Sequence, residues 1–309
     1  MQGLTLSRKY FEAHGLPLIE SRFGHVRDRI AAGLVGDGSE CFGFDDELSR
    51  DHDWGPGFCV WLTADDYLAF GPALQEAIDG LPTVFEGFGP RRQSRWGQDR
   101  VCVFEIGAFY RRFIGCGQPP DDPEDWLMLP ETALAACTNG EVFTDPPDEF
   151  SRRRRVLLDF YPEDVRLKKI ASRCMTIGQS GQYNYPRCVK RGDVFGARYA
   201  MTKFCADYFS AVFLLNKRYL PFYKWVGRAA STLPLLGPAS LDKITRLMGE
   251  AADPARCREL IESLCADLVG VLRAEALTEG TGDFLADHGP EVQRRIQHPG
   301  LRERDVWIG

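Results

Sequence analysis

Apolar positions in the first half of the chain come in short runs, as expected for buried strands. Residues 30–36 form one run, and residues 51–63 form another that contains a Gly-Pro-Gly irregularity. Residues 100–106 form a third, rich in β-branched and aromatic side chains. We therefore predict three strands, preceded by two short helices over residues 3–23, and a further short strand between two turns over residues 139–147. A helix over residues 63–81 is predicted to follow the second strand, because it begins with the N-cap signature Thr-Ala-Asp-Asp.

From about residue 150 the period of the apolar positions changes to that of helices. In the last of these segments apolar side chains recur at i, i+3 and i+4 and form one stripe. Helices are predicted over residues 162–176, 195–222, 240–252 and 254–278. The two patterns together predict an α+β fold, in which a small mixed β-sheet with flanking helices is followed by an all-α helical bundle.

The length of the chain indicates more than one domain. At 309 residues it exceeds the size at which a single hydrophobic core usually keeps growing. The change of period places an α+β domain over residues 1–150 and a helical bundle over residues 151–288. The polar stretch 289–309 is predicted to be a C-terminal tail.

Composition and charge exclude several classes of protein. Hydrophobic residues make up 44% of the chain and charged residues 27%, which excludes a disordered, collagen-like or coiled-coil protein. The 38 basic and 44 acidic residues give a net charge of −6. A protein that binds duplex DNA mainly through its phosphates is normally basic, so duplex DNA is disfavoured as a partner.

The cysteines and the N-terminus indicate where the protein works. The ten cysteines contain no CxxC pair, and most have apolar neighbours, which is typical of buried thiols in a reducing compartment. The N-terminus lacks the features of a signal peptide, and the longest uncharged apolar run, residues 211–215, is too short to span a membrane. We expect a cytoplasmic protein with no membrane partner.

Two aspartates and a glycine–serine pair are the residues most informative about chemistry. Gly38 and Ser39 follow the first predicted strand, and Asp51 and Asp53 begin the second. Residues i and i+2 of a strand point to the same face, so the two carboxylates are predicted to lie about 6–7 Å apart on one side. Paired carboxylates suit hard divalent cations, which can align a phosphoryl transfer. The glycine lets the backbone approach a phosphate, which the serine hydroxyl can also bind.

The order of these features resembles the minimal nucleotidyltransferases of the DNA polymerase β superfamily. Residues 33–58 are similar to a bacterial branch of that superfamily, the DUF4037-like domains of unknown function. The resemblance implies that Asp51 and Asp53 are catalytic and bind Mg²⁺ or Mn²⁺. It also implies that Gly38 and Ser39 contact the nucleoside triphosphate.

The same resemblance implies a third acidic residue on a later strand. Glu105 is the only acid within the third predicted strand, so it is the matching candidate, either as a metal ligand or as the general base that takes the acceptor proton. The alternative is a structural ion pair with Arg100, Arg111 or Arg112.

The helical half supplies further candidates for nucleotide binding. The resemblance implies a lysine that neutralises the triphosphate, and Lys217 is our choice; favourable placement at a helix C-terminus is the alternative. Tyr183 and Arg187 lie in a glycine-rich, polar and aromatic stretch, residues 178–187, whose aromatic faces can hold a base or an acceptor. A simple turn between helices is the alternative for this stretch.

Three features depart from the family pattern or allow a structural interpretation. His52 stands between the two aspartates, where we expect a core or hydrogen-bonded side chain rather than a ligand. The acidic triplet at residues 45–47 would repel a triphosphate unless it faces away. The run of four arginines at residues 152–155 is typical of a solvated helix face, with partner or nucleic-acid binding as the alternative.

These observations predict a nucleotidyltransferase. It would move a nucleoside monophosphate from a nucleoside triphosphate, with ATP the expected one, to an acceptor hydroxyl and release pyrophosphate, with Mg²⁺ or Mn²⁺ as cofactor. The acceptor is a small molecule, a protein or an RNA. The alternative is a non-catalytic nucleotide-binding or antitoxin-like regulatory module on the same fold.

Overall fold

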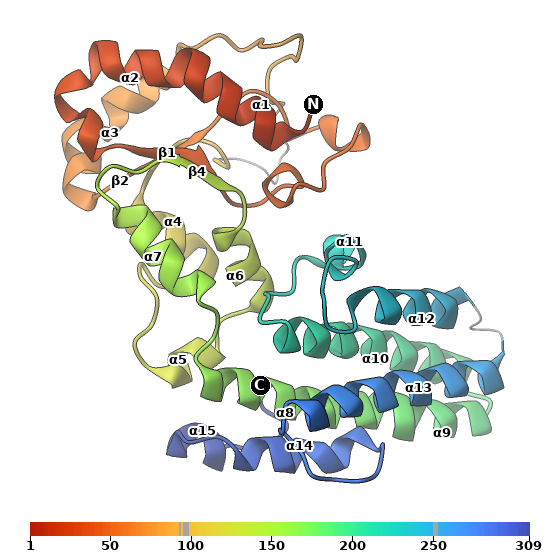
Figure 1. Cartoon of the computed structure of the whole chain (residues 1–309). Helices are drawn as coiled ribbons and strands as arrows, with labels where there is room; N and C mark the ends of the chain where they lie inside the picture. Colours follow the sequence, from red (N-terminus) through yellow and green to blue (C-terminus); the bar gives the residue numbers. More distant parts are fainter. Residues whose placement is uncertain (93, 95–98, 250–252) are drawn as a thin grey trace. The chain divides into compact units, whose positions relative to one another are not determined.

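The computed structural model describes the whole chain except residues 93, 95–98 and 250–252 (Figure 1). The chain divides into two compact units, each built from two segments. They comprise residues 1–119 with 132–159, and residues 120–131 with 160–309.

The limits of the two units differ from the predicted boundary after residue 150. Helix α7 (Glu149–Leu158) belongs to the first unit, because Phe150 is fully buried in its core. The short helix α5 (Pro123–Leu127) belongs to the second unit, where it packs against α8 (Glu163–Ile177). The change of apolar period along the sequence therefore does not locate the boundary between the units. These two helices belong to the units against which they pack, and that packing involves residues distant in sequence.

A four-stranded mixed sheet forms the centre of the first unit. Its order is β3-β2-β1-β4, with β1 antiparallel to both β2 and β4, and β2 parallel to β3. The strands are β1 (Ala31–Leu34), β2 (Cys59–Leu62), β3 (Val103–Glu105) and β4 (Glu141–Thr144). The sheet and the helices around it confirm the predicted α+β class.

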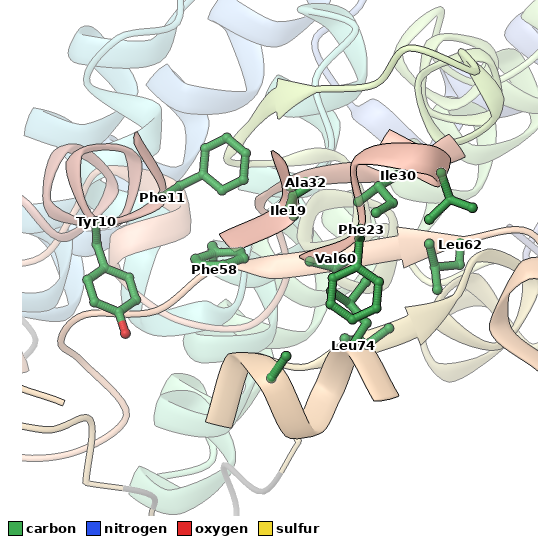
Figure 2. Close-up of a cluster of buried hydrophobic side chains, with 13 residues drawn as sticks. Tyr10, Phe11, Ile19, Phe23, Ile30, Ala32, Phe58, Val60, Leu62 and Leu74 are labelled. Carbon is green, nitrogen blue, oxygen red and sulfur yellow. The ribbon is translucent and has the colours of Figure 1, made fainter. Parts of the chain in front are cut away.

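One face of this sheet is covered by the N-terminal helices and by α3. Phe58, Val60 and Leu62 alternate toward this face and pack with Phe11, Leu74 and other apolar side chains (Figure 2). The covering helices are α1 (Gly3–Tyr10), η1 (Phe11–Gly15), α2 (Leu16–Arg22), η2 (Gly24–Arg29) and α3 (Ala64–Asp79). Thr63 caps α3 as predicted, accepting a hydrogen bond from the Asp66 amide.

The opposite face is covered by α4 (Ile106–Ile114) and α7. Trp61 of β2 points to this face, since neighbouring residues of a strand alternate between faces. Its ring stacks on Phe150 with centroids 3.9 Å apart and meets Phe109 edge-on. Helix α6 (Glu131–Thr138) leads into β4. Apolar side chains therefore pack against both faces of the sheet.

The second unit is helical and is built around α8. Helices α5, α10, α14 and α15 pack against α8, and α9 packs against α10. Besides α5 and α8, the elements of this unit are η5 (Gly178–Asn184), α9 (Tyr185–Lys190), α10 (Val194–Leu215), η6 (Tyr223–Trp225), α11 (Val226–Ala230), α12 (Gly237–Gly249), α13 (Pro254–Ala274), α14 (Leu285–Arg294) and α15 (Pro299–Glu303).

The predicted helices of the second half are confirmed with shifted ends. The clearest shift is in α10, which ends at Leu215 where a helix was predicted to run to residue 222. The Asn216 side chain donates to the carbonyls of Val212 and Leu235 and so turns the chain away from the helix axis. The last residues of the helix predicted over 240–252 lie outside the described residues.

The C-terminal stretch is folded, so the predicted tail is wrong. Helices α14 and α15 pack against α8, and Lys168 of α8 donates hydrogen bonds to the carbonyls of Arg304 and Asp305. Residues 289–309 are mostly polar, but a few spaced apolar side chains, Val292 and Leu301 among them, are fully buried. Within the described residues, no helix is both long and apolar enough to cross a membrane.

Candidate functional site

The loop that follows β1 has a backbone that only glycine adopts readily. Gly36 and Gly38 have φ values of 133° and 130°, in the region that side chains with a Cβ disfavour. The Asn139 side chain fixes Gly36 by accepting from its amide at 2.9 Å and donating to its carbonyl at 2.8 Å. Ser39 is the first residue before the short helix η3 (Glu40–Phe42). Among the described residues, the amides of Gly38 and Ser39 have no hydrogen-bond acceptor.

The two aspartates of the motif do not share the face of a strand, which corrects the prediction. β2 begins only at Cys59, and Asp53 has a left-handed φ of 52°. Asp51 follows the short helix η4 (Leu48–Arg50), has 66% of its side chain exposed, and lies 2.8 Å from Nδ1 of His52. The same-face rule holds only for extended backbone, so the prediction fails where the chain turns at Gly55 and Gly57.

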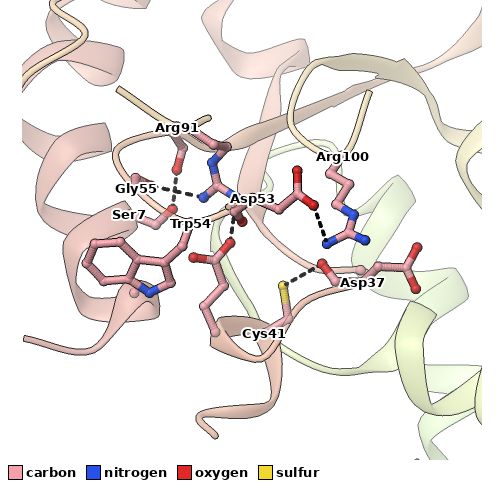
Figure 3. Close-up of polar contacts among 12 residues, drawn as sticks. Ser7, Asp37, Cys41, Asp53, Trp54, Gly55, Arg91 and Arg100 are labelled. Carbon is pink, nitrogen blue, oxygen red and sulfur yellow. Dashed lines mark hydrogen bonds and ion pairs between the residues drawn. The ribbon is translucent and has the colours of Figure 1, made fainter. Parts of the chain in front are cut away.

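Asp53 is buried and well supplied with partners. The amide and hydroxyl of Ser94 both donate to its carboxylate. Figure 3 shows its contact with Arg100, whose guanidinium lies 3.4 Å from the carboxylate. Burial raises the pKa of Asp53, but the hydrogen bonds from Ser94 and the positive charge of Arg100 outweigh it and leave the pKa below its usual range. The carboxylate of Asp53 is therefore ionised at neutral pH.

A buried ion pair fixes the backbone on which Asp53 lies. Arg91 donates to Glu40 at 2.6 Å, to the carbonyl of Asp53 at 2.8 Å and to that of Gly55 at 2.9 Å (Figure 3). Only 10% of the Arg91 side chain and 2% of the Glu40 side chain are exposed. No local sequence pattern predicts this ion pair, because its two residues lie 51 positions apart. It joins the glycine loop after β1 to the aspartate loop before β2.

Two further arginines line the glycine loop. Arg112 lies 3.8 Å from the carboxylate of Asp37, between the two glycines, and donates to the carbonyl of Asp99 at 2.7 Å. Arg100, the partner of Asp53, keeps its buried Nε–H without an acceptor among the described residues. The loop therefore has free amides and two guanidinium groups, a combination that suits an anionic ligand.

The acidic triplet of the motif is used within the fold. Asp45 accepts hydrogen bonds from the amide of Gly3 at 2.7 Å and from the Trp54 ring at 3.0 Å. Asp46 accepts from the amides of Leu48 and Ser49. These two carboxylates act as structural acceptors.

Glu105 is the last residue of β3 and caps α4. Its carboxylate accepts from the amides of Gly107 and Ala108, both at 2.6 Å, and from Arg111 at 2.8 Å. The pairing with Arg111 is the structural alternative considered for this residue. Across the part of the chain that the structure describes, no three His, Cys, Asp or Glu side chains form a group that could hold a metal ion. Asp51, Asp53 and Glu105 therefore do not come together as three metal ligands in the described residues.

The three candidates from the helical half lie in the second unit and are not brought together there. Lys217 follows α10 and pairs with Glu163 at 3.7 Å. Tyr183 and Arg187 lie in η5 and α9, with the guanidinium 4.8 Å from the centre of the tyrosine ring. α9 packs near the start of α10, and a helix of that length spans about 33 Å, so Lys217 lies at the far end. Their roles in nucleotide binding stay predictions.

The arginine run of α7 is engaged within the first unit. Arg152 pairs with Glu149 and Arg155 with Asp148, whereas Arg153 and Arg154 donate to backbone carbonyls of residues 117 and 138–140. All ten cysteines are free, and burial raises the pKa of the Cys59 thiol to about 11.

Part of the chain matches the model of a protein family. Residues 126–226 match the model of DUF4037, described as a domain of unknown function. The matched residues make up about a third of the chain, which is similar to the DUF4037 family over this segment. The match confirms the DUF4037 resemblance predicted from the sequence. The DUF4037 segment runs from α5 to α11, so the Gly38–Asp53 motif lies outside it.

No curated protein matches the chain. Among solved structures it is similar to a nucleotidyltransferase-like protein from Exiguobacterium sibiricum, at 11% identity, over 94% of this chain and 81% of that one. The TM-score of that pair is 0.37.

Proposed function

We propose that the first unit binds a nucleoside triphosphate and transfers its nucleoside monophosphate to an acceptor hydroxyl. The acceptor oxygen would form a bond to the α-phosphorus and release its proton to solvent, the bond from that phosphorus to the bridging oxygen would break, and pyrophosphate would leave. The observation that carries the proposal is the glycine loop after β1, with the unpaired amides of Gly38 and Ser39 beside Arg112.

Each of these groups has a defined task in the proposal. The amides of Gly38 and Ser39 and the Ser39 hydroxyl would bind phosphate oxygens, which donors in a loop hold without a bulky side chain in the way. Arg112 would exchange its long 3.8 Å contact with Asp37 for a phosphate, and Arg100 would supply a second positive charge. Charge that develops on the departing pyrophosphate is stabilised best by such fixed donors.

Metal dependence is kept as a separate part of the proposal. Mg²⁺ would supply charge neutralisation and in-line alignment of the phosphates when bound. The residues in the arrangement described do not fit a site of three carboxylates, since Asp53 is engaged by Ser94 and Arg100, and Glu105 caps α4. No step of the proposed transfer is therefore routed through the metal, and each assay includes arms with Mg²⁺, with Mn²⁺ and with a chelator.

The same engaged carboxylates support a second candidate function, a nucleotide-binding module without turnover. In that case the glycine loop would bind the nucleotide, while Asp53 and Glu105 keep the structural partners that they have here. Such a module would bind a nucleoside triphosphate and release it unchanged. Turnover separates the two candidates.

The test is turnover of each α-labelled nucleoside triphosphate by the full chain, with Arg112→Gln as the variant of the proposed phosphate site and Asp53→Asn and Asp51→Asn as variants of the aspartate motif. Removal of one fixed donor to the transition state lowers turnover about a hundredfold or more, which we expect for Arg112→Gln. An equal loss in either aspartate variant would give that carboxylate a part in the transfer. Glu47→Gln removes an exposed carboxylate from the same region and is the matched control, with unchanged turnover. Turnover that survives in Asp53→Asn would remove that residue from the site, and binding without turnover in the wild type would favour the non-catalytic module.

A further inference from the structure

A separate surface of the second unit combines exposed aromatic rings with positive charge. It is formed by η5, α9 and the start of α10, which pack side by side (Figure 1). We call it the α9–α10 surface; its residues are Tyr183, Arg187, Lys190, Arg191, Phe195, Arg198 and Tyr199, all of them exposed. The glycine loop and the proposed nucleotide transfer do not use it.

The aromatic side chains of the α9–α10 surface present open faces. Phe195 is 79% exposed and Tyr199 69%, and their rings lie parallel one helical turn apart, with centroids separated by 5.9 Å. Tyr183 is 50% exposed beneath the guanidinium of Arg187. Exposed rings of this size are costly in water, and their grouping on one face indicates a ligand with flat apolar surfaces.

The charge of this surface is opposite to that of the chain as a whole. Residues 183–203 contain five basic residues and one acidic residue, for a net charge of +4, whereas the whole chain carries −6. The one acid, Asp193, caps α10 by accepting from the amide of Gly196 at 2.8 Å. The positive charge is therefore local and is not offset by neighbouring carboxylates of the same segment.

Four of these cations lack a carboxylate partner, unlike many others in the second unit. Within the described residues no ion pair involves Arg187, Lys190, Arg191 or Arg198. Elsewhere in the unit cations such as Arg166, Arg173, Lys243, Arg273 and Arg304 are each paired with an acid. Unpaired charges grouped on one face are available to bind an anionic ligand.

A small pocket lies between α9 and the start of α10. It has a volume of about 220 Å³, and its lining includes Tyr185, Val194, Met201, Arg198 and the helix-capping Asp193. Ligand clefts for larger molecules usually hold roughly 300–1,000 Å³, so this pocket suits one planar ring. Arg198 belongs to both the pocket and the charged surface, which places a positive charge at the edge of an apolar recess.

We infer that the α9–α10 surface binds single-stranded nucleic acid. Unpaired bases expose π-faces that stack on aromatic side chains, while regularly spaced phosphates bind lysine and arginine. A duplex hides its base faces, so the exposed rings favour a single strand. Ribose and deoxyribose strands share this chemistry and are distinguished in the test.

The test is fluorescence anisotropy of the full chain with labelled oligouridylate and oligothymidylate and with a duplex of equal length. Strands of about 20 nucleotides exceed the roughly 4–16 that one such module covers. We expect single strands to bind with a Kd on the order of 10⁻⁶–10⁻⁴ M at physiological salt and the duplex more weakly. With four phosphates neutralised, the logarithm of affinity should fall with that of salt concentration with a slope of about −3. Tighter binding by RNA than by DNA would assign the ribose strand as the ligand.

Two variants separate stacking from charge. Phe195→Ala with Tyr199→Ala should weaken single-strand binding about tenfold or more and leave the salt slope unchanged, because a stacked base contributes roughly one tenfold step or more. Lys190→Gln with Arg191→Gln should reduce the steepness of the slope by about 1.4, because each phosphate that a cation neutralises accounts for about 0.7. All four side chains are exposed, so the fold should be retained, which circular dichroism checks.

Matched controls come from another exposed part of the same unit. Arg294→Gln with Arg302→Gln removes two exposed cations, and Trp307→Ala removes an exposed aromatic ring. Neither should change the affinity or the salt slope. Equal weakening by these controls, equal binding by the duplex, or no binding of single strands at about 10⁻⁴ M protein would overturn the inference. A wild type that dimerises through this face, with monomeric aromatic variants, would also overturn it in favour of self-association.

Discussion

Arg91 and Arg191 carry the same guanidinium group in opposite settings. Arg91 of the first unit is buried against Glu40 and donates to two backbone carbonyls, whereas Arg191 of the second unit is exposed and has no ion-pair partner among the described residues. A buried charge needs partners on every side, and in satisfying it the chain fixes the backbone around it. An exposed charge fixes nothing and is free to bind a ligand. Buried Arg91 therefore positions the loop that carries Asp53, whereas exposed Arg191 is part of a surface that can bind a ligand.

The largest expected effect is the loss of stability on removing the buried Arg91. Arg91→Ala should lower the free energy of unfolding by about 3–5 kcal/mol, since it leaves the Glu40 carboxylate buried without its partner. Urea unfolding measures the loss. Arg92→Ala, at the neighbouring exposed position, is the control and should change little. Equal stability of the two variants would mean that the ion pair does not fix the Asp53 loop.

Lys169, a buried lysine of the second unit, makes the stability of the protein depend on pH. Burial lowers the pKa of Lys169 to about 8, against about 10.4 in an unfolded chain. Between these values the unfolded state binds more protons than the native state, so stability should rise with pH from about 8 to 10.4 and fall as pH returns to 8.

Lys169→Met isolates this effect. The difference in unfolding free energy between variant and wild type should favour the variant at pH 7 and shrink by about 2–3 kcal/mol toward pH 10. Lys190→Met, at an exposed lysine, should show no such change. A difference between Lys169→Met and wild type that stays constant over this range would contradict the lowered pKa.

Glu105 tests whether a candidate catalytic acid acts as a structural one. Glu105→Ala should lower stability by about 1 kcal/mol, because α4 loses its N-cap. Glu76→Ala, an exposed acid of α3, is the control. With a purely structural role, nucleotide affinity and turnover per folded molecule stay at the wild-type level. Unchanged stability with lost turnover would instead return Glu105 to the catalytic site.

The smallest expected effect is on stability when the exposed cations Lys190 and Arg191 are removed. Lys190→Gln with Arg191→Gln should shift the melting midpoint by less than about 2 °C, because exposed charges without partners contribute little to stability. Calorimetry measures the shift. A larger loss would show that these cations have structural partners and would remove the contrast with Arg91.

The comparison also explains how much the sequence could predict. Periodicity located the main helices, and runs of apolar residues located three strands, because those signals are local. The glycine–serine turn after β1 was likewise visible in sequence. The ion pair of Glu40 and Arg91 was not, since it joins loops 51 positions apart.

Other misses have specific physical causes. Asp51 and Asp53 were expected on one strand, but left-handed backbone at Asp53 and the glycines after it delay β2 until Cys59. Glu105 was visible as the single acid of its strand, yet its capping role depends on where α4 begins. The α9–α10 surface was seen only through Tyr183 and Arg187, because exposure and pairing are properties of the fold.

The central claim is that the glycine loop after β1 binds a nucleoside triphosphate, and thermal unfolding with each nucleotide tests it most directly. A ligand at a hundred times its Kd stabilises the native state by about 2.7 kcal/mol, which for a domain of this size raises the melting midpoint by roughly 5–10 °C. The rise should shrink in Ser39→Ala and in Arg112→Gln, and remain in Glu47→Gln. Melting in the presence of Mg²⁺ and of a chelator shows whether the metal contributes. No rise with any of the four triphosphates at millimolar concentration, or an equal rise in Ser39→Ala and Arg112→Gln, would contradict the claim.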